Sequence, residues 1–155
     1  MELKTYRQED LVFILELFYK TVHTINAADY TKRQLDAWAP EKPDREKWEQ
    51  SLSAHYALIA REGGKLLGFG DIMRDGYLDR LYVAADFQGR GVGTALLAAL
   101  EEYAFGHGAE RIATYASLTA KPFFEKSGYR MTEEHFAARK GVVLQNFLMM
   151  KERQG

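Results

Sequence analysis

The sequence predicts an α/β protein of the mixed α+β kind, with a central and mostly antiparallel sheet that contains one parallel strand-helix-strand unit. Three observations favour this fold class: short runs of alternating apolar residues, longer segments with a helical apolar period, and a glycine cluster that joins a strand to a helix. With 155 residues, 46% of them apolar, the chain can bury a sizeable core. We therefore expect one domain over residues 1–155, with helices on both faces of the sheet.

The first third of the chain predicts one strand and several helices. Residues 3–7 alternate as a strand does, and residues 9–25 carry apolar side chains at helical spacing after an acidic start. Residues 26–53 are polar and contain two prolines, which indicates two short helices with a break between them. Thr31 and Asp44 are the expected N-caps, because their side chains can accept backbone N–H groups of a first helical turn.

The middle of the chain predicts an antiparallel meander. Residues 55–84 contain three strand-like runs, separated by Gly63-Gly64 and by Asp75-Gly76. A glycine-rich loop and an apolar helix over residues 94–108 follow. Together with the next strand, these elements form the parallel unit, and ligands of such sheets bind beyond the carboxyl ends of the strands.

The last third predicts a strand over residues 111–117, a short helix over residues 119–128 and a hairpin over residues 129–152. The strand at 111–117 is the second strand of the parallel unit. Sequence repeats and low-complexity segments are absent from the whole chain.

Composition excludes several classes of function. The 21 basic and 22 acidic residues nearly cancel, which argues against nucleic acid or an anionic membrane as partner. The sequence has neither an apolar run near the ~18 residues of a membrane span nor a secretory leader, so we expect a soluble, cytoplasmic protein. Because there is no cysteine and the four histidines are scattered, we expect no disulfide, no cysteine nucleophile and no metal site.

The glycine-rich loop is typical of an anion site. Gly89, Gly91 and Gly93 lie just before the helix, where backbone N–H groups have no internal partner and the helix dipole favours phosphate. Arg90 adds a positive charge. The spacing fits neither a nucleotide P-loop nor a dinucleotide fingerprint. The alternative is that these glycines only form a tight turn.

Gln88, Gly91 and Gly93, which follow the segment RLYV and precede a leucine-rich helix, resemble the acyl-CoA pyrophosphate loop of the GNAT superfamily of N-acetyltransferases. Residues 116–129 are similar to the late helix of that superfamily, which ends in a glycine-aromatic pair, and residues 21–40 resemble a YafP-like bacterial branch. The resemblance implies a GNAT-like fold in which the strands at 77–84 and 111–117 splay apart at the cofactor site.

The resemblance also implies the chemistry. Acetyl-CoA is the expected acyl donor, and a primary amine of a small molecule or a protein is the expected acceptor, which attacks the thioester directly. The backbone of Leu81, Tyr82 and Val83 is expected to pair with pantetheine, with an N–H near Leu81 stabilising the oxyanion. The expected pyrophosphate residues are Gln88, Gly89, Arg90, Gly91, Val92, Gly93 and Thr94. Homodimers are common in the superfamily.

One position departs from the family pattern. The usual general acid is a tyrosine, and its place in the cofactor site is taken by Phe124, which cannot donate a proton. Another group or water is then needed to protonate the thiolate. Ser117 replaces a frequent asparagine and either reaches the cofactor or caps the following helix. The alternative function is an acyl-CoA-binding sensor without catalysis.

Three residues are candidates for activating the amine. Tyr77 and Asp79 share one strand face near the expected thioester. A carboxylate within an apolar strand is either functional or paired, here with Arg80 or Arg74. His23 is the third candidate, since its segment forms a wall of the acceptor pocket in the superfamily; the alternative is a helix-end residue.

Overall fold

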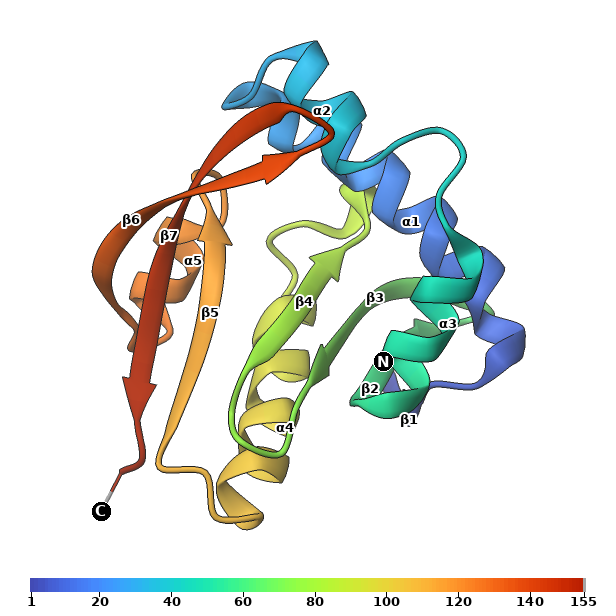
Figure 1. Cartoon of the computed structure of the whole chain (residues 1–155). Helices are drawn as coiled ribbons and strands as arrows, with labels where there is room; N and C mark the ends of the chain where they lie inside the picture. Colours follow the sequence, from blue (N-terminus) through green and yellow to red (C-terminus); the bar gives the residue numbers. More distant parts are fainter. Residues whose placement is uncertain (155) are drawn as a thin grey trace.

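The computed structural model describes residues 1–154 and contains the predicted elements in the predicted order (Figure 1). Short 3-10 turns lie at residues 8–10, 26–28 and 85–87. The helices and strands are β1 (Glu2–Thr5), α1 (Leu11–Thr24), α2 (Lys32–Trp38), α3 (Arg45–Ala54), β2 (Tyr56–Glu62), β3 (Lys65–Ile72), β4 (Leu78–Val83), α4 (Val92–Gly106), β5 (Arg111–Ser117), α5 (Lys121–Lys126), β6 (Arg130–Arg139) and β7 (Val142–Glu152). That these helices and strands form a single domain over residues 1–155 remains a prediction.

The sheet is divided in two. Strands pair antiparallel in the orders β1-β2-β3-β4 and β5-β7-β6. Over residues 1–154, one parallel bridge, between Tyr77 and Ala113, joins the two halves. Beyond that bridge β4 and β5 diverge, and α4 passes behind the gap (Figure 1). The predicted parallel unit is therefore reduced to one bridge, and the predicted splay of its strands is confirmed.

Apolar side chains cover both faces of the first half-sheet. Along β2, Leu58 and Ala60 belong to the apolar cluster that includes the leucines of α4. The alternating residues Ala57 and Ile59 belong to a second cluster, which includes α1. Because successive side chains of a strand point to opposite faces, helices must lie on both sides of this sheet, as predicted.

The short helices begin where the sequence predicts. Thr31 Oγ1 accepts the N–H of Gln34, and the Gln34 side chain accepts the N–H of Thr31, which makes a reciprocal capping box. Asp44 accepts the N–H of Lys47 at the start of α3. None of the helices in residues 1–154 combines the length and apolar character of a membrane span.

Two glycines of β3 let α4 approach the sheet closely. A Cβ atom at Gly70 would lie 2.9 Å from the carbonyl oxygen of Arg80 and 2.9 Å from Leu100 Cδ1. At Gly68 the corresponding distances are 2.9 Å to the carbonyl oxygen of Tyr82 and 3.1 Å to Leu96 Cδ1. Because backbone cannot move aside cheaply, these glycines set the position of α4 and of the loop before it.

We expect Gly70→Val to lower the free energy of unfolding by about 2 kcal/mol, because the new side chain collides with β4 and α4. Thermal unfolding measures the effect as a fall in Tm of roughly 4–8 °C. Gly106→Ala is the control, since nothing lies within 4 Å of its Cβ position. An equal loss in both variants would contradict the close packing at Gly70.

Candidate active site

A cavity of about 180 Å³ lies in the gap between β4 and β5. Residues 79–83 of β4 form one wall and residues 114–117 of β5 form the other. Gly93 in the first turn of α4 and Phe124 in α5 also line it. The divergence of the two strands thus creates a slot that opens toward the glycine-rich loop.

The edge of β4 that faces this slot carries backbone groups without a strand partner. Hydrogen bonds of an antiparallel pair involve alternate residues. Ala84 N–H donates to Leu67 O on β3, so Leu81 and Val83 direct their N–H and C=O groups away from β3. In agreement, Val83 O accepts hydrogen bonds from Thr21 Oγ1 at 3.0 Å and Gln88 Nε2 at 2.8 Å.

The glycine-rich loop ends in the amino terminus of α4. Gly89 and Gly91 have φ values of 74° and 81°, a left-handed conformation that favours glycine. The first backbone hydrogen bond of the helix joins Ala95 N–H to Gly91 O, so the N–H groups of residues 92–94 precede the helical ladder. A Cβ atom at Gly93 would lie 3.4 Å from Val83 Cγ2 and Phe123.

A second cavity, of about 150 Å³, lies beside the first. Its walls come from β4, β5 and the β6–β7 hairpin. The side chains that line both cavities are Trp38, Asp79, Tyr82, Tyr115 and Ser117. The two cavities therefore share one wall, and Asp79 is the only carboxylate of the described chain in that wall.

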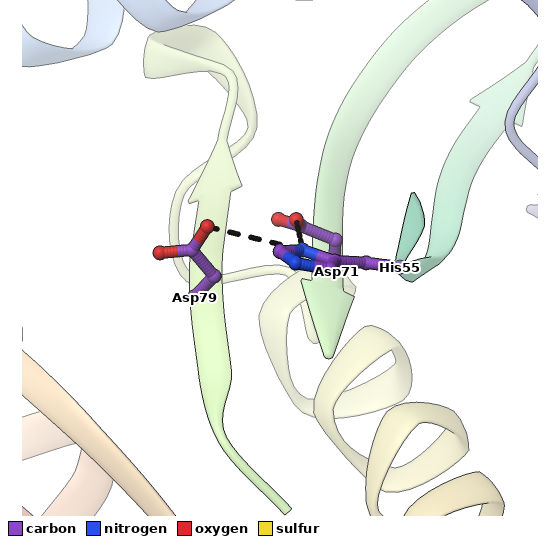
Figure 2. Close-up of side chains that lie close together, drawn as sticks. All are labelled: His55, Asp71 and Asp79. Carbon is purple, nitrogen blue, oxygen red and sulfur yellow. Dashed lines mark hydrogen bonds and ion pairs between the residues drawn. The ribbon is translucent and has the colours of Figure 1, made fainter. Parts of the chain in front are cut away.

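Asp79 borders a cluster of charged side chains from three strands or strand ends (Figure 2). Asp71 on β3 is completely buried; its Oδ2 atom lies 2.7 Å from His55 Nδ1 and 2.9 Å from Arg80 Nη1. Asp79 Oδ2 lies 3.6 Å from Arg80 Nη2 and 3.9 Å from His55 Nδ1. The Asp79 side chain keeps 29% exposure, so it reaches the cavities as well as the cluster.

The cluster shifts the pKa values of its two innermost groups. The hydrogen bond to the Asp71 carboxylate raises the pKa of His55, although partial burial opposes the shift. Burial raises the pKa of Asp71, against the opposing effect of the His55 hydrogen bond and the Arg80 charge. Asp71 Oδ1 has no hydrogen-bond partner in the described chain.

The same cluster contains three possible metal ligands, although the sequence predicts no metal site. Ligand atoms of His55, Asp71 and Asp79 lie within 4.8 Å of one another, which histidine spacing in the sequence does not indicate. The guanidinium of Arg80, however, already lies 2.9 Å from Asp71 Oδ2. Because Arg80 supplies the opposite charge at hydrogen-bond distance, the carboxylates need no cation to compensate them.

Three predicted site residues lie in the cavities. Tyr77 lines the second cavity with Asp79; burial, and then the Asp79 charge, raise the pKa of Tyr77. Ser117 lines both cavities. Its Oγ accepts the N–H of Ala120 just before α5, and this hydrogen bond supports the interpretation of Ser117 as a cap of that helix. Phe124 is buried at 4% exposure and lines the first cavity.

His23 is not brought to the site. Its Nε2 lies 2.8 Å from the carbonyl oxygen of Ala39, and its ring packs against Tyr19 with centroids 4.2 Å apart. It lines neither cavity. The contacts of His23 are therefore those expected of a residue near a helix end, and His23 is not part of the wall that the two cavities share.

Sequence reasoning missed several residues of the site. Tyr115 lines both cavities, while His135 and Arg139 line the second. Alternation in the strand at 111–117 could have placed Tyr115 with Ser117 on the face toward the gap. Nothing local singles out His55 or Asp71, because they meet only through the pairing of β2 with β3.

A sequence profile for a family described as "Acetyltransferase (GNAT) domain" matches residues 26–151. The chain belongs to the GNAT acetyltransferase family. Membership makes it an acetyl-CoA-dependent N-acetyltransferase, which confirms the resemblance, the fold, the acyl donor and the class of reaction predicted from the sequence.

Individual GNAT proteins resemble the whole chain. The uncharacterized N-acetyltransferase YafP of Escherichia coli (strain K12) is 28% identical over 99% of this chain and 97% of its own length, as the YafP-like interpretation predicts. A crystal structure of a GCN5-related N-acetyltransferase from Rhodopseudomonas palustris is 34% identical, with a TM-score of 0.95, over 98% of this chain and 95% of that chain. PaiA N-acetyltransferase from Thermoplasma acidophilum, crystallised with coenzyme A, shares the fold with a TM-score of 0.80 at 21% identity, covering 98% of each chain.

The raised pKa of His55 predicts a pH-dependent stability difference. A histidine whose folded pKa is raised stabilises the fold fully below its unfolded value of about 6.5, and this contribution disappears as pH rises through the folded value. We expect His55→Gln to lower Tm by roughly 2–6 °C near about pH 6 and by less near about pH 9. His107→Gln, in an exposed side chain, is the control in the same melts. A deficit that increases with pH would argue against a protonated His55.

Proposed function

We propose that this GNAT enzyme holds the arm of acetyl-CoA between β4 and β5 and receives a small primary amine in the second cavity, so that the acetyl group passes between them at the shared wall. The observation that carries the proposal is the meeting of the two cavities at Asp79, beside the gap in the sheet. No covalent intermediate on the protein is needed, because an amine can attack a thioester directly.

The donor side of the proposal rests on the loop and the edge of β4. The N–H groups of residues 92–94 and the dipole of α4 suit the pyrophosphate, with Gln88 to Thr94 as its binding segment. Glycine at 89 and 91 permits the left-handed turns and keeps side chains out of the cradle. Arg90 is exposed and can add a positive charge. The coenzyme A bound to the Thermoplasma neighbour supports the same use of this fold.

Backbone groups of residues 81–83 suit the pantetheine arm, whose amides can pair with a strand edge. The backbone groups of Leu81 and Val83, which have no strand partner on this side, provide the partners, and Tyr82 adds a wall to both cavities. Gln88 would have to release Val83 O as the arm enters. When bound, acetyl-CoA supplies an acetyl group activated as a thioester.

Asp79 is the residue that we propose to accept the proton of the amine. Asp79 lines both cavities, so its carboxylate lies where the amine and the thioester would meet, and Arg80 Nη2 lies 3.6 Å from its Oδ2 atom. Tyr77 stands beside it in the second cavity, and its raised pKa keeps the hydroxyl protonated, as a hydrogen-bond donor to the acceptor.

The leaving thiolate requires a proton from a group other than Phe124. Tyr115 presents a phenol to both cavities and is 40% exposed, so we assign this role to Tyr115. Ser117, in the same wall, is already bonded to Ala120 and is better suited to holding water or the donor than to moving a proton. A donor-binding sensor without turnover remains the second candidate, because Phe124 removes the family's usual acid.

We expect coenzyme A to raise the Tm of the wild type through mass action, by roughly 5 °C or more at about 100 times Kd. Gly91→Glu should remove this rise, because it puts a negative side chain into the pyrophosphate cradle. Gly108→Glu is a matched control: Gly108 also has positive φ, at the other end of α4, with nothing within 4 Å. A rise that survives Gly91→Glu would argue against the loop as the donor site.

We expect Asp79→Asn to lower kcat by about 10²- to 10⁴-fold on any amine that the wild type acetylates, while the rise in Tm with coenzyme A persists. Release of coenzyme A thiol measures turnover. Tyr115→Phe should lower kcat less, because the thiol has a pKa near ~8.5 and leaves readily. Glu46→Gln, an exposed carboxylate on α3, is the control. Coenzyme A binding without turnover on any amine would favour the sensor.

A further inference from the structure

The second cavity carries opposite charges on different walls. Asp79 on β4 provides the negative charge, and Arg139, the last residue of β6, provides the positive one. No ion pair within 4.0 Å joins them in residues 1–154. An acceptor that fills this cavity therefore meets a carboxylate at the wall shared with the donor cavity and a guanidinium from the hairpin.

Arg139 has no acidic partner in the described chain. Arg80, which lines the first cavity, is by contrast paired with Asp71, and Arg130, at the opposite end of β6 and away from the cavities, is paired with Glu152. The positive charge of Arg139 partly offsets the rise in pKa that burial imposes on Tyr77 and Tyr82. Because Arg139 lines this cavity and has no acidic partner within 4.0 Å in residues 1–154, its guanidinium is available to an anionic group of the acceptor.

The hairpin that carries Arg139 is fixed to the rest of the site. Tyr30 Oη donates to Gln145 O at 2.7 Å, and Gln34 Nε2 donates to Val143 O at 3.0 Å. The end of the hairpin lies beside α2, next to the gap between the half-sheets (Figure 1). Arg139 pairs with Val142 across the turn, so its backbone position is set by the ladder.

Aromatic side chains line much of the cavity, beside the polar residues Ser117, Gln145 and Asn146. Tyr77 and Tyr115 pack edge to face with ring centroids 6.3 Å apart, and the His135 ring packs on Tyr115 at 4.3 Å. Trp38 and Tyr82 complete this part of the wall. At about 150 Å³ the cavity is smaller than the usual pocket for a drug-sized ligand. These walls suit a short body with an aromatic or apolar surface.

We propose that the acceptor is a small amino acid whose amine and carboxylate lie at opposite ends of the molecule, with its amine at Asp79, an apolar or aromatic body against Tyr77 and Tyr115, and a carboxylate bound by Arg139. A guanidinium binds a carboxylate through two parallel hydrogen bonds, which is the strongest recognition that this wall offers. This inference rests on the proposed function, because it names the acceptor class of the same site.

The test compares amines that differ only in the anionic group. The pairs are 4-(aminomethyl)benzoate with 4-(aminomethyl)benzamide, and 3-(aminomethyl)benzoate with 3-(aminomethyl)benzamide. We expect the wild type to show a kcat/KM at least about tenfold higher for one of the acids than for its amide. Arg139→Gln should raise KM for that acid about 10- to 100-fold while leaving the amide unchanged, and Arg139→Lys should recover part of the loss. Arg45→Gln, an exposed arginine of α3, is the control.

A second measurement separates this inference from the proposed function. Binding of the preferred acid is followed as a rise in Tm of the complex with coenzyme A, in the wild type and in Arg139→Gln. Arg139-dependent binding without turnover would contradict the proposed transfer and still support the carboxylate site. Equal turnover of acids and amides, or equal effects of Arg139→Gln on both, would overturn the carboxylate site and leave the transfer intact. If the protein neither bound nor acetylated any of the acids, the inference would be overturned.

Discussion

Strands β4 and β5 share one bridge, between Tyr77 and Ala113, and diverge beyond it. Each strand keeps an antiparallel partner on its other side, β3 or β7, so the divergence does not cost either half-sheet its ladder. The backbone groups of Leu81 and Val83 that face the gap gain the freedom to bind something other than a strand. The first cavity and the wall that it shares with the second both follow from this one break in the pairing, and Gly68 and Gly70 let the start of α4 lie beside it.

The charged cluster behind Asp79 depends on the same arrangement. A completely buried carboxylate such as Asp71 is costly unless cations and hydrogen-bond donors surround it. The guanidinium of Arg80 and the imidazole of His55 both contact Asp71, and Arg80 is itself held by Ser51 Oγ and by the face of Trp48 at 4.3 Å. Asp79 is thus the one member of the cluster that lines both cavities.

Local pattern sufficed for much of this structure. The left-handed turns at Gly89 and Gly91 follow from glycine spacing before a helix, and an acidic residue in an apolar strand was enough to single out Asp79. The cluster could not be predicted, because His55 meets Asp71 across the β2–β3 ladder, 16 residues away. Arg139 was missed because an exposed arginine near a hairpin turn has no local signature. His23 was a candidate base because the sequence alone does not show its hydrogen bond to the carbonyl oxygen of Ala39.

Val83 O, at the open edge of β4, receives hydrogen bonds from Thr21 and from Gln88. An exposed strand edge is a template for pairing with other chains, so these two side chains shield the molecule against edge-to-edge association. The hydroxyl of Thr21 comes from α1 and is buried, whereas Gln88 belongs to an exposed loop. In the binding mode proposed for acetyl-CoA, an amide N–H of the arm replaces Gln88 Nε2 as a donor to this oxygen, so the edge of β4 is covered both before and after the ligand binds.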